Sequence, residues 1–243
     1  MTTDQQRVLW VTGAGSGMGR AAAVAAAGRG WRIALSGRRL DPLEQTARLV
    51  EDAGGTSFVL PLDTRDVASI SDGRAAIAQR WGAVTDLVLA AGLNVPARYW
   101  RDQSIAEFTD VVATNLTGVA AMVDAVLPDL RGGDGGHVVV ISSYAAWRFS
   151  PHSGVAYAAS KTALVALCQT LNEQEAPDGV RACHLCPGEV DSDFLDLRPQ
   201  VPDESARALM LTAEDVARAV MFVLESPPHV RIDELVISPV AQR

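Results

Sequence analysis

The sequence predicts an α/β protein in which a mostly parallel sheet is covered by helices on both faces. Seven short segments are almost continuously apolar, which is the pattern of strands that are buried on both sides. Segments with helical periodicity separate these strands in steady alternation. A glycine-rich turn joins the first strand to the first helix. Together these observations favour a doubly wound fold of about seven strands, in a single domain over residues 1–243.

The expected strands follow one another along the whole chain. In order they are Val8–Val11, Ile33–Ser36, Ser57–Leu60, Asp86–Ala90, His137–Ser142, Val180–Leu185 and Glu234–Ser238. The expected helices are Gly19–Arg29, a helix from Asp41 to the Gly54-Gly55 pair, Ser104–Leu130, Ala156–Glu175 and Ala213–Glu225. Asp41 is the predicted N-cap of its helix, because Pro42 then lies in the first turn. The irregular segment Asp191–Leu211, with Pro199 and Pro202, is expected to form a mobile lid over a substrate.

Composition and charge argue against several classes of protein. The net charge of −8 and the isoelectric point near 5.0 disfavour nucleic acid or an anionic membrane as the main partner. No segment approaches the roughly 18 consecutive apolar residues of a membrane span, and the N-terminus lacks the pattern of a signal peptide. A chain of 243 residues buries roughly 70% of its unfolded surface, so it needs no disulfide or structural metal. With three cysteines and no export signal, a cytoplasmic location is expected.

The turn after the first strand has the features of a phosphate-binding loop. From Thr12 to Gly19 it reads Thr-Gly-Ala-Gly-Ser-Gly-Met-Gly, and an alanine-rich helix follows at once. Glycines let the backbone approach a pyrophosphate, and the helix N-terminus offers free N–H groups and a positive dipole end. A tight turn without a ligand would show a similar pattern. The residues expected to bind a dinucleotide here are Gly13, Gly15, Ser16, Gly17, Met18 and Gly19.

Tyr157 and Lys161 form a candidate proton-transfer pair. Their spacing of four places both side chains on one face of the expected helix, one turn apart. A phenol has a reference pKa near ~10, and a neighbouring ammonium would lower the pKa of Tyr157. The pair could then exchange a proton with a carbonyl or alcohol oxygen. An ordinary surface pair on a helix is the alternative interpretation.

A pair of serines, Ser142 and Ser143, ends the fifth expected strand. The carboxyl ends of strands in a parallel sheet are where ligands bind, so a serine hydroxyl here could donate to a substrate carbonyl. If the strand continues through both residues, their side chains point to opposite faces. Position in the strand alone leaves Ser142 and Ser143 both open as the donor.

These motifs together resemble those of the short-chain dehydrogenase/reductase family, over nearly the whole chain. The glycine motif has the family's Thr-Gly-x-x-x-Gly-x-Gly form, and the tyrosine and lysine have its spacing. The resemblance implies a Rossmann-type fold with a catalytic tetrad of Asn115, Ser143, Tyr157 and Lys161. In the family the asparagine holds a water that links the lysine to solvent. Ser143 lies one position further from Tyr157 than is usual in the family.

The resemblance also implies further contacts with the cofactor. The turn Ala90-Ala91-Gly92 keeps only the Ala-Gly of the family's Asn-Asn-Ala-Gly motif. Ser192 stands where the family often has a threonine that binds the nicotinamide amide, and Asp63 matches an acidic residue beside the adenine. The cofactor residues implied in this way are Asp63, Ala91, Gly92, Tyr157, Lys161, Pro187, Gly188, Val190 and Ser192.

The end of the second strand indicates which nicotinamide cofactor is used. An NAD site places an acidic residue roughly 20 residues after the glycine loop, to bind the ribose 2′-hydroxyl. Here Gly37 takes that position, and Arg38 and Arg39 follow. A guanidinium can clamp a 2′-phosphate, whereas a carboxylate would repel it. We therefore expect NADP(H) rather than NAD(H), the alternative being that both arginines are solvated surface charges.

The expected activity is hydride transfer between NADP(H) and a small-molecule carbonyl or secondary alcohol, with Tyr157 as general acid/base. A non-catalytic NADP(H)-binding regulatory protein is the alternative, and it would not need the tetrad. No metal is expected, because Cys183 and Cys186 point to opposite faces of a strand and no second cysteine pair exists.

Substrate and assembly are expected from the resemblance. The C-terminal segment Arg231–Val240 looks like that of the family's 3-hydroxy acid (serine-type) dehydrogenase branch, and broader carbonyl or 3-oxoacyl reductases stay open. His152, Tyr144 and Trp147 are further candidates for the substrate pocket. The alternatives are that His152 is a surface loop residue and that Tyr144 and Trp147 only pack the loop. The family is usually a homodimer or homotetramer, assembled through the helices that correspond to Ser104–Leu130 and Ala156–Glu175.

Overall fold

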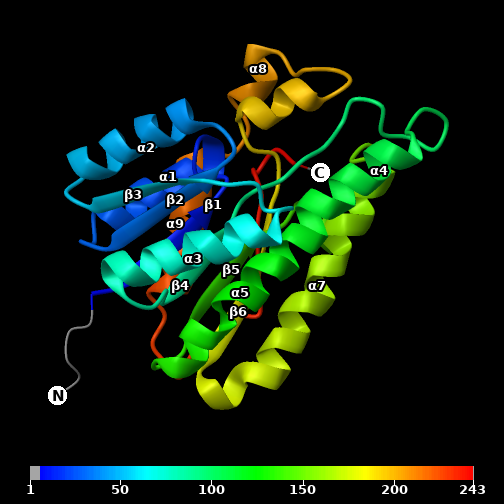
Figure 1. Ribbon diagram of the computed structural model, residues 1–243. Helices are drawn as coiled ribbons and strands as arrows, with labels where there is room; N and C mark the ends of the chain where they lie inside the picture. Colours follow the sequence, from blue (N-terminus) through cyan, green and yellow to red (C-terminus); the bar gives the residue numbers. More distant parts are fainter. Residues whose placement is uncertain (1–5, 243) are drawn as a thin grey trace.

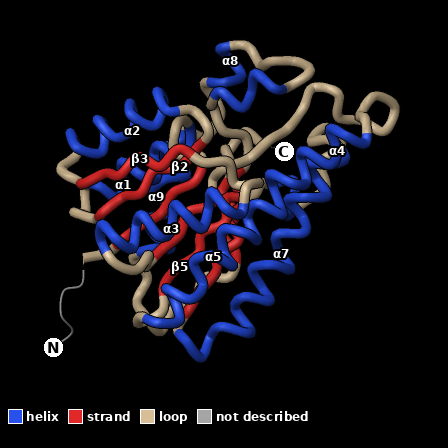
Figure 2. Tube along the Cα trace, viewed as in Figure 1, coloured by secondary structure: helices blue, strands red, loops and turns tan. Residues whose placement is uncertain are grey.

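One parallel sheet is the framework of the molecule (Figures 1 and 2). The structure is a computed structural model that describes residues 6–242, and its seven strands are ordered β3-β2-β1-β4-β5-β6-β7, all parallel. The strands are β1 (Val8–Thr12), β2 (Arg32–Gly37), β3 (Thr56–Pro61), β4 (Asp86–Leu89), β5 (Gly136–Ile141), β6 (Val180–Pro187) and β7 (Glu234–Ile237). The predicted doubly wound fold is confirmed. Residues 1–5, on which the expectation about a signal peptide partly rests, lie outside the described residues.

Helices cover both faces of the sheet (Figure 1). One face carries α1 (Gly17–Ala27), α2 (Leu40–Asp52) and α9 (Ala213–Leu224), and the other carries α3 (Val67–Trp81), α5 (Gly118–Gly132) and α7 (Val155–Glu175). Shorter elements are α4 (Ile105–Val112), η1 (Ala113–Thr117), α6 (Tyr144–Trp147), η2 (Ala176–Asp178), η3 (Asp193–Leu197) and α8 (Glu204–Arg207). Strand β1 gives Leu9 and Val11 to one core layer and Val8 and Trp10 to the other. This double burial explains why the strand sequences are continuously apolar.

Helix α3 was not among the helices expected from the sequence. Its buried residues are Ile70, Gly73 and Ile77, and polar residues surround them, so the apolar stripe is narrow. The start of the helix is nevertheless well determined. The Asp66 carboxylate accepts hydrogen bonds from the backbone N–H groups of Ala68 (3.1 Å) and Ser69 (3.3 Å), as an N-cap residue does.

The start of α2 differs from the prediction. The helix begins at Leu40, and Arg39 is the N-cap residue, with extended backbone angles (φ −105°, ψ 123°). Asp41 therefore lies in the first turn and is not the N-cap. A carboxylate in the first turn still interacts favourably with the helix dipole, so the residue type suits the position.

The helix predicted over Ser104–Leu130 is present as α4, η1 and α5 in direct succession. It starts with a capping box, in which the Ser104 hydroxyl and the Glu107 carboxylate bond each other's backbone N–H groups. By length and composition it would also suit a membrane span. Its buried residues, among them Met122 and Val126, pack in the core against the sheet. The π-helical turn η1 places Asn115 at its centre.

A buried carboxylate ties the N-terminal strand to the middle of the sheet. Asp86, at the start of β4, has a side chain that is 1% exposed. It accepts hydrogen bonds from Arg7 Nε (2.9 Å), Thr85 Oγ1 (2.7 Å) and the backbone N–H of His137 (3.1 Å). Burial alone would raise the pKa of the Asp86 carboxyl, but the hydrogen bonds and positive charges around it outweigh burial and lower the pKa.

Replacing this carboxylate should destabilise the fold. We expect Asp86→Asn to reduce the free energy of unfolding by about 2–4 kcal/mol, because Arg7 is left without its counter-charge. The contribution of Asp86 should be complete above the unfolded carboxyl pKa near ~3.9 and should disappear as the pH falls through the lower pKa of the folded state. Urea unfolding at several pH values measures both effects. Glu225→Gln, which removes the exposed ion pair with Arg29, should change stability by no more than about 1 kcal/mol. Equal losses in the two variants would contradict the prediction.

Candidate active site

The carboxyl ends of the strands open into one large cavity. Its volume is about 1390 Å³, and it extends from the glycine loop after β1 to the start of α7 and the segment after β6. The chain passes from β1 to β2 on one side and reaches β4 on the other, so the cavity lies at the point where the strand order reverses. Ligands bind at this point in doubly wound folds.

Almost all the predicted site residues line this cavity. They are Gly13, Gly15, Ser16, Gly17, Met18, Gly19, Arg38, Arg39, Asp63, Ala91, Gly92, Ser143, Tyr157, Lys161, Pro187, Gly188, Val190 and Ser192. Asn115 is the exception, since it is fully buried behind the wall. Residues from opposite ends of the chain thus share one space.

The glycine loop is shaped for close approach. Gly13 has φ +63°, and a Cβ atom there would lie 2.8 Å from the carbonyl carbon and oxygen of Ala90, so the loops after β1 and β4 touch through backbone atoms. Gly17, with φ +50°, starts α1. Ser16, the N-cap residue, makes no side-chain hydrogen bond to the first turn of α1. The N–H groups at this helix end therefore fit a pyrophosphate.

The far side of the loop carries positive charge. Arg38 and Arg39 are exposed and line the cavity beside Gly37, where no acidic side chain is present. Asp63 is nearby, but its carboxylate is bound by Arg65 at 2.7 Å, and this hydrogen bond lowers the pKa of Asp63. The residues present thus fit a dinucleotide with an additional phosphate on this ribose.

Tyr157 stands in an electrostatically mixed environment. Burial raises the pKa of the Tyr157 phenol above its ordinary value. Hydrogen bonding with the Ser143 side chain and the positive charges of Arg198 and Arg98 act in the opposite direction and favour the phenolate. The side chain of Phe194 lies over the tyrosine, with 5.9 Å between the ring centroids.

Lys161 does not act on Tyr157 in the way that the spacing suggests. The sequence predicts that its ammonium lowers the pKa of Tyr157, but in the structure Nζ lies 5.9 Å from the tyrosine ring centroid and donates to the carbonyl oxygen of Ile141 at 2.8 Å. Arg98 and Arg198 supply the positive charge near the phenol instead. Lys161 is itself buried, which lowers its pKa to about 8.

Ser142 and Ser143 make different hydrogen bonds. The Ser142 hydroxyl is buried and donates to the backbone carbonyl oxygen of Lys161 at 3.2 Å, which joins β5 to α7. The Ser143 hydroxyl accepts from the N–H of Ala145 at 3.2 Å and also interacts with Tyr157. The geometry thus favours Ser143 as the serine that shares a substrate oxygen with Tyr157.

Asn115 fixes the loop after β4. Its Oδ1 accepts from the N–H of Leu93 at 2.7 Å, and its Nδ2 donates to the carbonyl oxygen of Leu93 at 2.8 Å and to Ser160 Oγ at 3.2 Å. A Cβ atom on Gly92 would lie 3.7 Å from Asn115 Oδ1 and 3.9 Å from Lys161 Nζ. The Asn115 side chain, which lies behind the cavity wall, therefore fixes the backbone at Gly92 and Leu93 next to Lys161.

The segment predicted as a lid forms part of the cavity. Strand-like pairing of Val190 with Leu211 joins its two ends, through hydrogen bonds from the N–H of Asp191 to the carbonyl oxygen of Leu211 (2.8 Å) and from the N–H of Leu211 to the carbonyl oxygen of Glu189 (2.9 Å). Figure 1 shows the segment, with α8, above the carboxyl ends of the strands. The stretch 192–200 lines the cavity.

Sequence reasoning missed several residues of the cavity wall. Arg98, Phe194 and Arg198 line the cavity, and so do Tyr144 and His152, which the sequence offered only as candidates. The missed residues come from loops after β4 and β6 without a recognisable motif. The one available signal was position, because these loops follow strands at their carboxyl ends.

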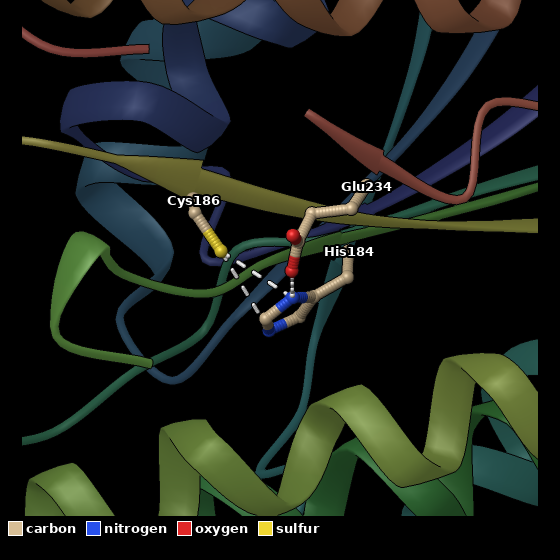
Figure 3. A group of neighbouring side chains, drawn as sticks. All are labelled: His184, Cys186 and Glu234. Carbon is tan, nitrogen blue, oxygen red and sulfur yellow. Dashed lines mark hydrogen bonds and ion pairs between the residues drawn. The ribbon is translucent and has the colours of Figure 1, made fainter. Parts of the chain in front are cut away.

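A histidine, a cysteine and a glutamate meet beside this wall (Figure 3). The sequence gives Cys183 and Cys186 as the pair to weigh for a metal site. In the structure Cys183 packs in the core layer of α1 and α9, whereas Cys186 contacts His184. His184 Nδ1 is 3.0 Å from Glu234 Oε1 and 3.3 Å from Cys186 Sγ. Burial raises the pKa of the Cys186 thiol to about 12, so a metal would have to displace a firmly held proton. Cys186 also receives a hydrogen bond from the N–H of Ser143, so it supports that turn from behind.

Comparison with known proteins agrees with this geometry. A family model for short chain dehydrogenases matches residues 7–201. Sulfoacetaldehyde reductase of Chromohalobacter salexigens is 32% identical over 242 residues, which cover 96% of this chain and 94% of the relative. An alcohol dehydrogenase from the archaeon Thermococcus sibiricus, complexed with 5-hydroxy-NADP, has a TM-score of 0.87 at 33% identity and covers 98% of each chain.

A closed form of serine dehydrogenase complexed with NADP+ has the same TM-score of 0.87, at 29% identity over 97% of each chain. Both solved structures superimpose over nearly the full length of the chain, so the likeness includes the glycine loop, α7 and the segment after β6. The chain therefore belongs to the short-chain dehydrogenase family and is an oxidoreductase with a Rossmann-type fold.

Proposed function

We propose that the protein transfers hydride between NADP(H) and a carbonyl or secondary alcohol, with Tyr157 as general acid/base. The observation that carries this proposal is that Ser143, Tyr157 and Lys161 line the same cavity as the glycine loop and Arg38. One end of the cavity thus fits a dinucleotide phosphate, and the other offers proton-transfer groups. A non-catalytic NADP(H)-binding protein would require only the first end.

The chain's own residues would position the reactants. In reduction, the hydroxyls of Ser143 and Tyr157 donate to the substrate carbonyl oxygen, and Tyr157 then gives up its proton to that oxygen. Lys161 would hold the nicotinamide ribose, and Asn115 keeps the backbone beside the lysine in place. The nicotinamide supplies or accepts the hydride. Lys161 is buried beneath the cavity wall, whereas Tyr157 is partly exposed to the cavity, where a substrate oxygen can reach it.

Several features support NADP(H) over NAD(H). Arg38 and Arg39 stand at the cavity rim, and Gly37 removes the carboxylate that an NAD site would use. Two similar solved structures carry an NADP-type cofactor. We also propose a cytoplasmic homodimer or homotetramer assembled through α4, α5 and α7, and a lid over residues 191–211 that orders when substrate binds.

Cofactor choice provides a direct test. Replacing Arg38 with Asp puts a carboxylate next to the 2′-phosphate, and we expect NADPH binding to weaken by roughly 10- to 100-fold. The affinity for NADH, which has no such phosphate, should not fall. Titrating both cofactors against the unmodified protein and the variant measures this. Equal catalytic efficiency of the unmodified protein with NADPH and NADH would refute the assignment.

The role of Tyr157 is tested by removing its hydroxyl. We expect Tyr157→Phe to lower turnover at least ~10²-fold while NADPH binding changes little, because only the proton-transfer group is lost. Alcohol oxidation requires the phenolate, so its rate should rise with pH in the unmodified protein and not in the variant. Since burial raises the pKa of Tyr157, the difference in phenolate absorbance between the two cofactor-free proteins should develop above about pH 10. Near-normal turnover of the variant would show that another group transfers the proton.

The two serines offer a matched pair of variants. Ser143→Ala removes a hydroxyl that interacts with Tyr157, and we expect kcat to fall by roughly 10²-fold, the scale for one lost donor at a reacting oxygen. Ser142→Ala removes hydrogen bonds to the Lys161 backbone and to the Cys186 side chain, and it should affect thermal stability more than kcat. Steady-state kinetics and thermal melts of both variants separate the two roles. A larger loss of kcat in Ser142→Ala would reverse the assignment.

A further inference from the structure

One wall of the cavity holds a buried arginine without a counter-charge. Arg98 lies in the loop between β4 and α4, lines the cavity and is 4% exposed. Among the residues that the structure describes, no carboxylate lies within ion-pair distance of its guanidinium. Burying a cation is costly unless an anion accompanies it. The uncompensated charge of Arg98 therefore indicates that its counter-ion is a bound ligand.

The Arg98 side chain is held in place before any ligand binds. Its Nε donates to the carbonyl oxygen of Val95 at 2.9 Å, and its guanidinium also donates to the carbonyl oxygen of Leu197 in the lid segment. Gly154, at the start of α7, lies so close that a Cβ atom there would be 2.7 Å from Arg98 Cβ. The N–H of Val155 donates to the backbone carbonyl oxygen of Arg98 at 2.9 Å. A fixed guanidinium loses little conformational entropy when an anion binds.

Hydrogen bonding to two carbonyl groups does not by itself explain an arginine at this position. Neutral donors such as an asparagine amide can satisfy backbone carbonyl oxygens without the cost of burying a charge. The two carbonyl groups use Nε and one terminal nitrogen of Arg98. The guanidinium has five N–H donors, so others can serve a ligand in the cavity.

Arginines outnumber carboxylates in this part of the cavity. Arg148 and Arg198 line it together with Arg98. The acidic residues in that lining are Glu189, which pairs with Arg198 at 3.1 Å, and Asp193, which is exposed. Arg98 and Arg198 both act electrostatically on the Tyr157 phenol, so they lie close to the proposed reacting oxygen. This cationic wall belongs to a chain with a net charge of −8.

We propose that the substrate carries a carboxylate-type anion in addition to its carbonyl or alcohol, and that Arg98 binds this anion with Arg198 beside it. This inference rests on the proposed function and names the substrate class of the same site. The anion would orient the substrate so that its carbonyl oxygen reaches Ser143 and Tyr157. It takes no part in the reaction, in which the carbonyl gains a hydride and a proton and NADPH becomes NADP+.

Matched substrates test the proposal in the unmodified protein. The probes are unbranched ω-oxo carboxylates of three to five carbons, each compared with its uncharged methyl ester. We expect kcat/KM for the best acid to exceed that of its ester at least ~30-fold, the effect of one buried charge pair. Equal values for acid and ester would overturn the inference while leaving the proposed function intact. If NADPH binds but neither series is reduced, the proposed function fails and this inference fails with it.

Variants of Arg98 identify the residue responsible. Arg98→Met should raise KM for the acids at least ~30-fold and leave KM for the esters nearly unchanged, and Arg98→Lys should restore part of the difference. Arg29→Met, on the surface outside the cavity, should alter neither. NADPH affinity and thermal melting show whether each variant is folded. Equal effects of Arg98→Met on acid and ester would assign Arg98 a structural role and overturn the inference.

A binding measurement without turnover completes the test. Succinate cannot be reduced at a carbonyl, yet it presents a carboxylate. It should bind the complex of unmodified protein and NADP+ and compete with the acids, whereas dimethyl succinate should not. Calorimetric titration that detects no succinate binding to this complex at millimolar concentration would contradict the proposal, whatever the behaviour of the variants.

Discussion

The backbone contact between Gly13 and Ala90 is the constraint on which the site depends. A Cβ atom at Gly13 would lie 2.8 Å from the carbonyl group of Ala90, so only glycine lets the turns after β1 and β4 meet. Both turns lie at the point where the strand order reverses. Their contact leaves the N-terminus of α1 facing the same space as the loop that Asn115 holds and the residues on α7. The glycine loop and the Tyr157 end of the cavity are therefore fixed relative to each other by the sheet itself.

Burial determines how the reactive groups behave. Tyr157 and Lys161 share a face of α7, yet the lysine bonds a strand carbonyl oxygen and the positive charge near the phenol comes from arginines in two loops. Burial raises the pKa of the Tyr157 phenol and lowers the pKa of the Lys161 amine to about 8, so it disfavours the charged form of both groups. A ligand charge placed beside these two groups would shift both pKa values again, because opposite charges stabilise and like charges destabilise the ionised forms.

Features encoded locally were predictable from the sequence. The strands were found because burial on both faces demands continuous apolar runs, and the glycine loop and the Tyr157–Lys161 pair were found because each lies within one short segment. Helix α3 was not predicted, because its stripe of buried apolar residues is narrow. Arg98 and Arg198 were not predicted to line the cavity. The wall that they form comes from loops a hundred residues apart, which only the folded chain brings together. The electrostatics of Tyr157 depend on that assembly and were predicted incorrectly for the same reason.

The pairing of Val190 with Leu211 brings together the two ends of the segment between them. This isolated β-bridge lies outside the seven strands, and its backbone hydrogen bonds hold the two ends of the segment in place whatever lies between them. Lengthening such an excursion costs little, roughly 0.6 kcal/mol for each doubling of its length. Insertions, deletions and replacements within this segment would therefore leave the glycine-loop end of the cavity undisturbed. Changes in this single surface segment would reshape one wall of the cavity and keep the rest of the fold unchanged.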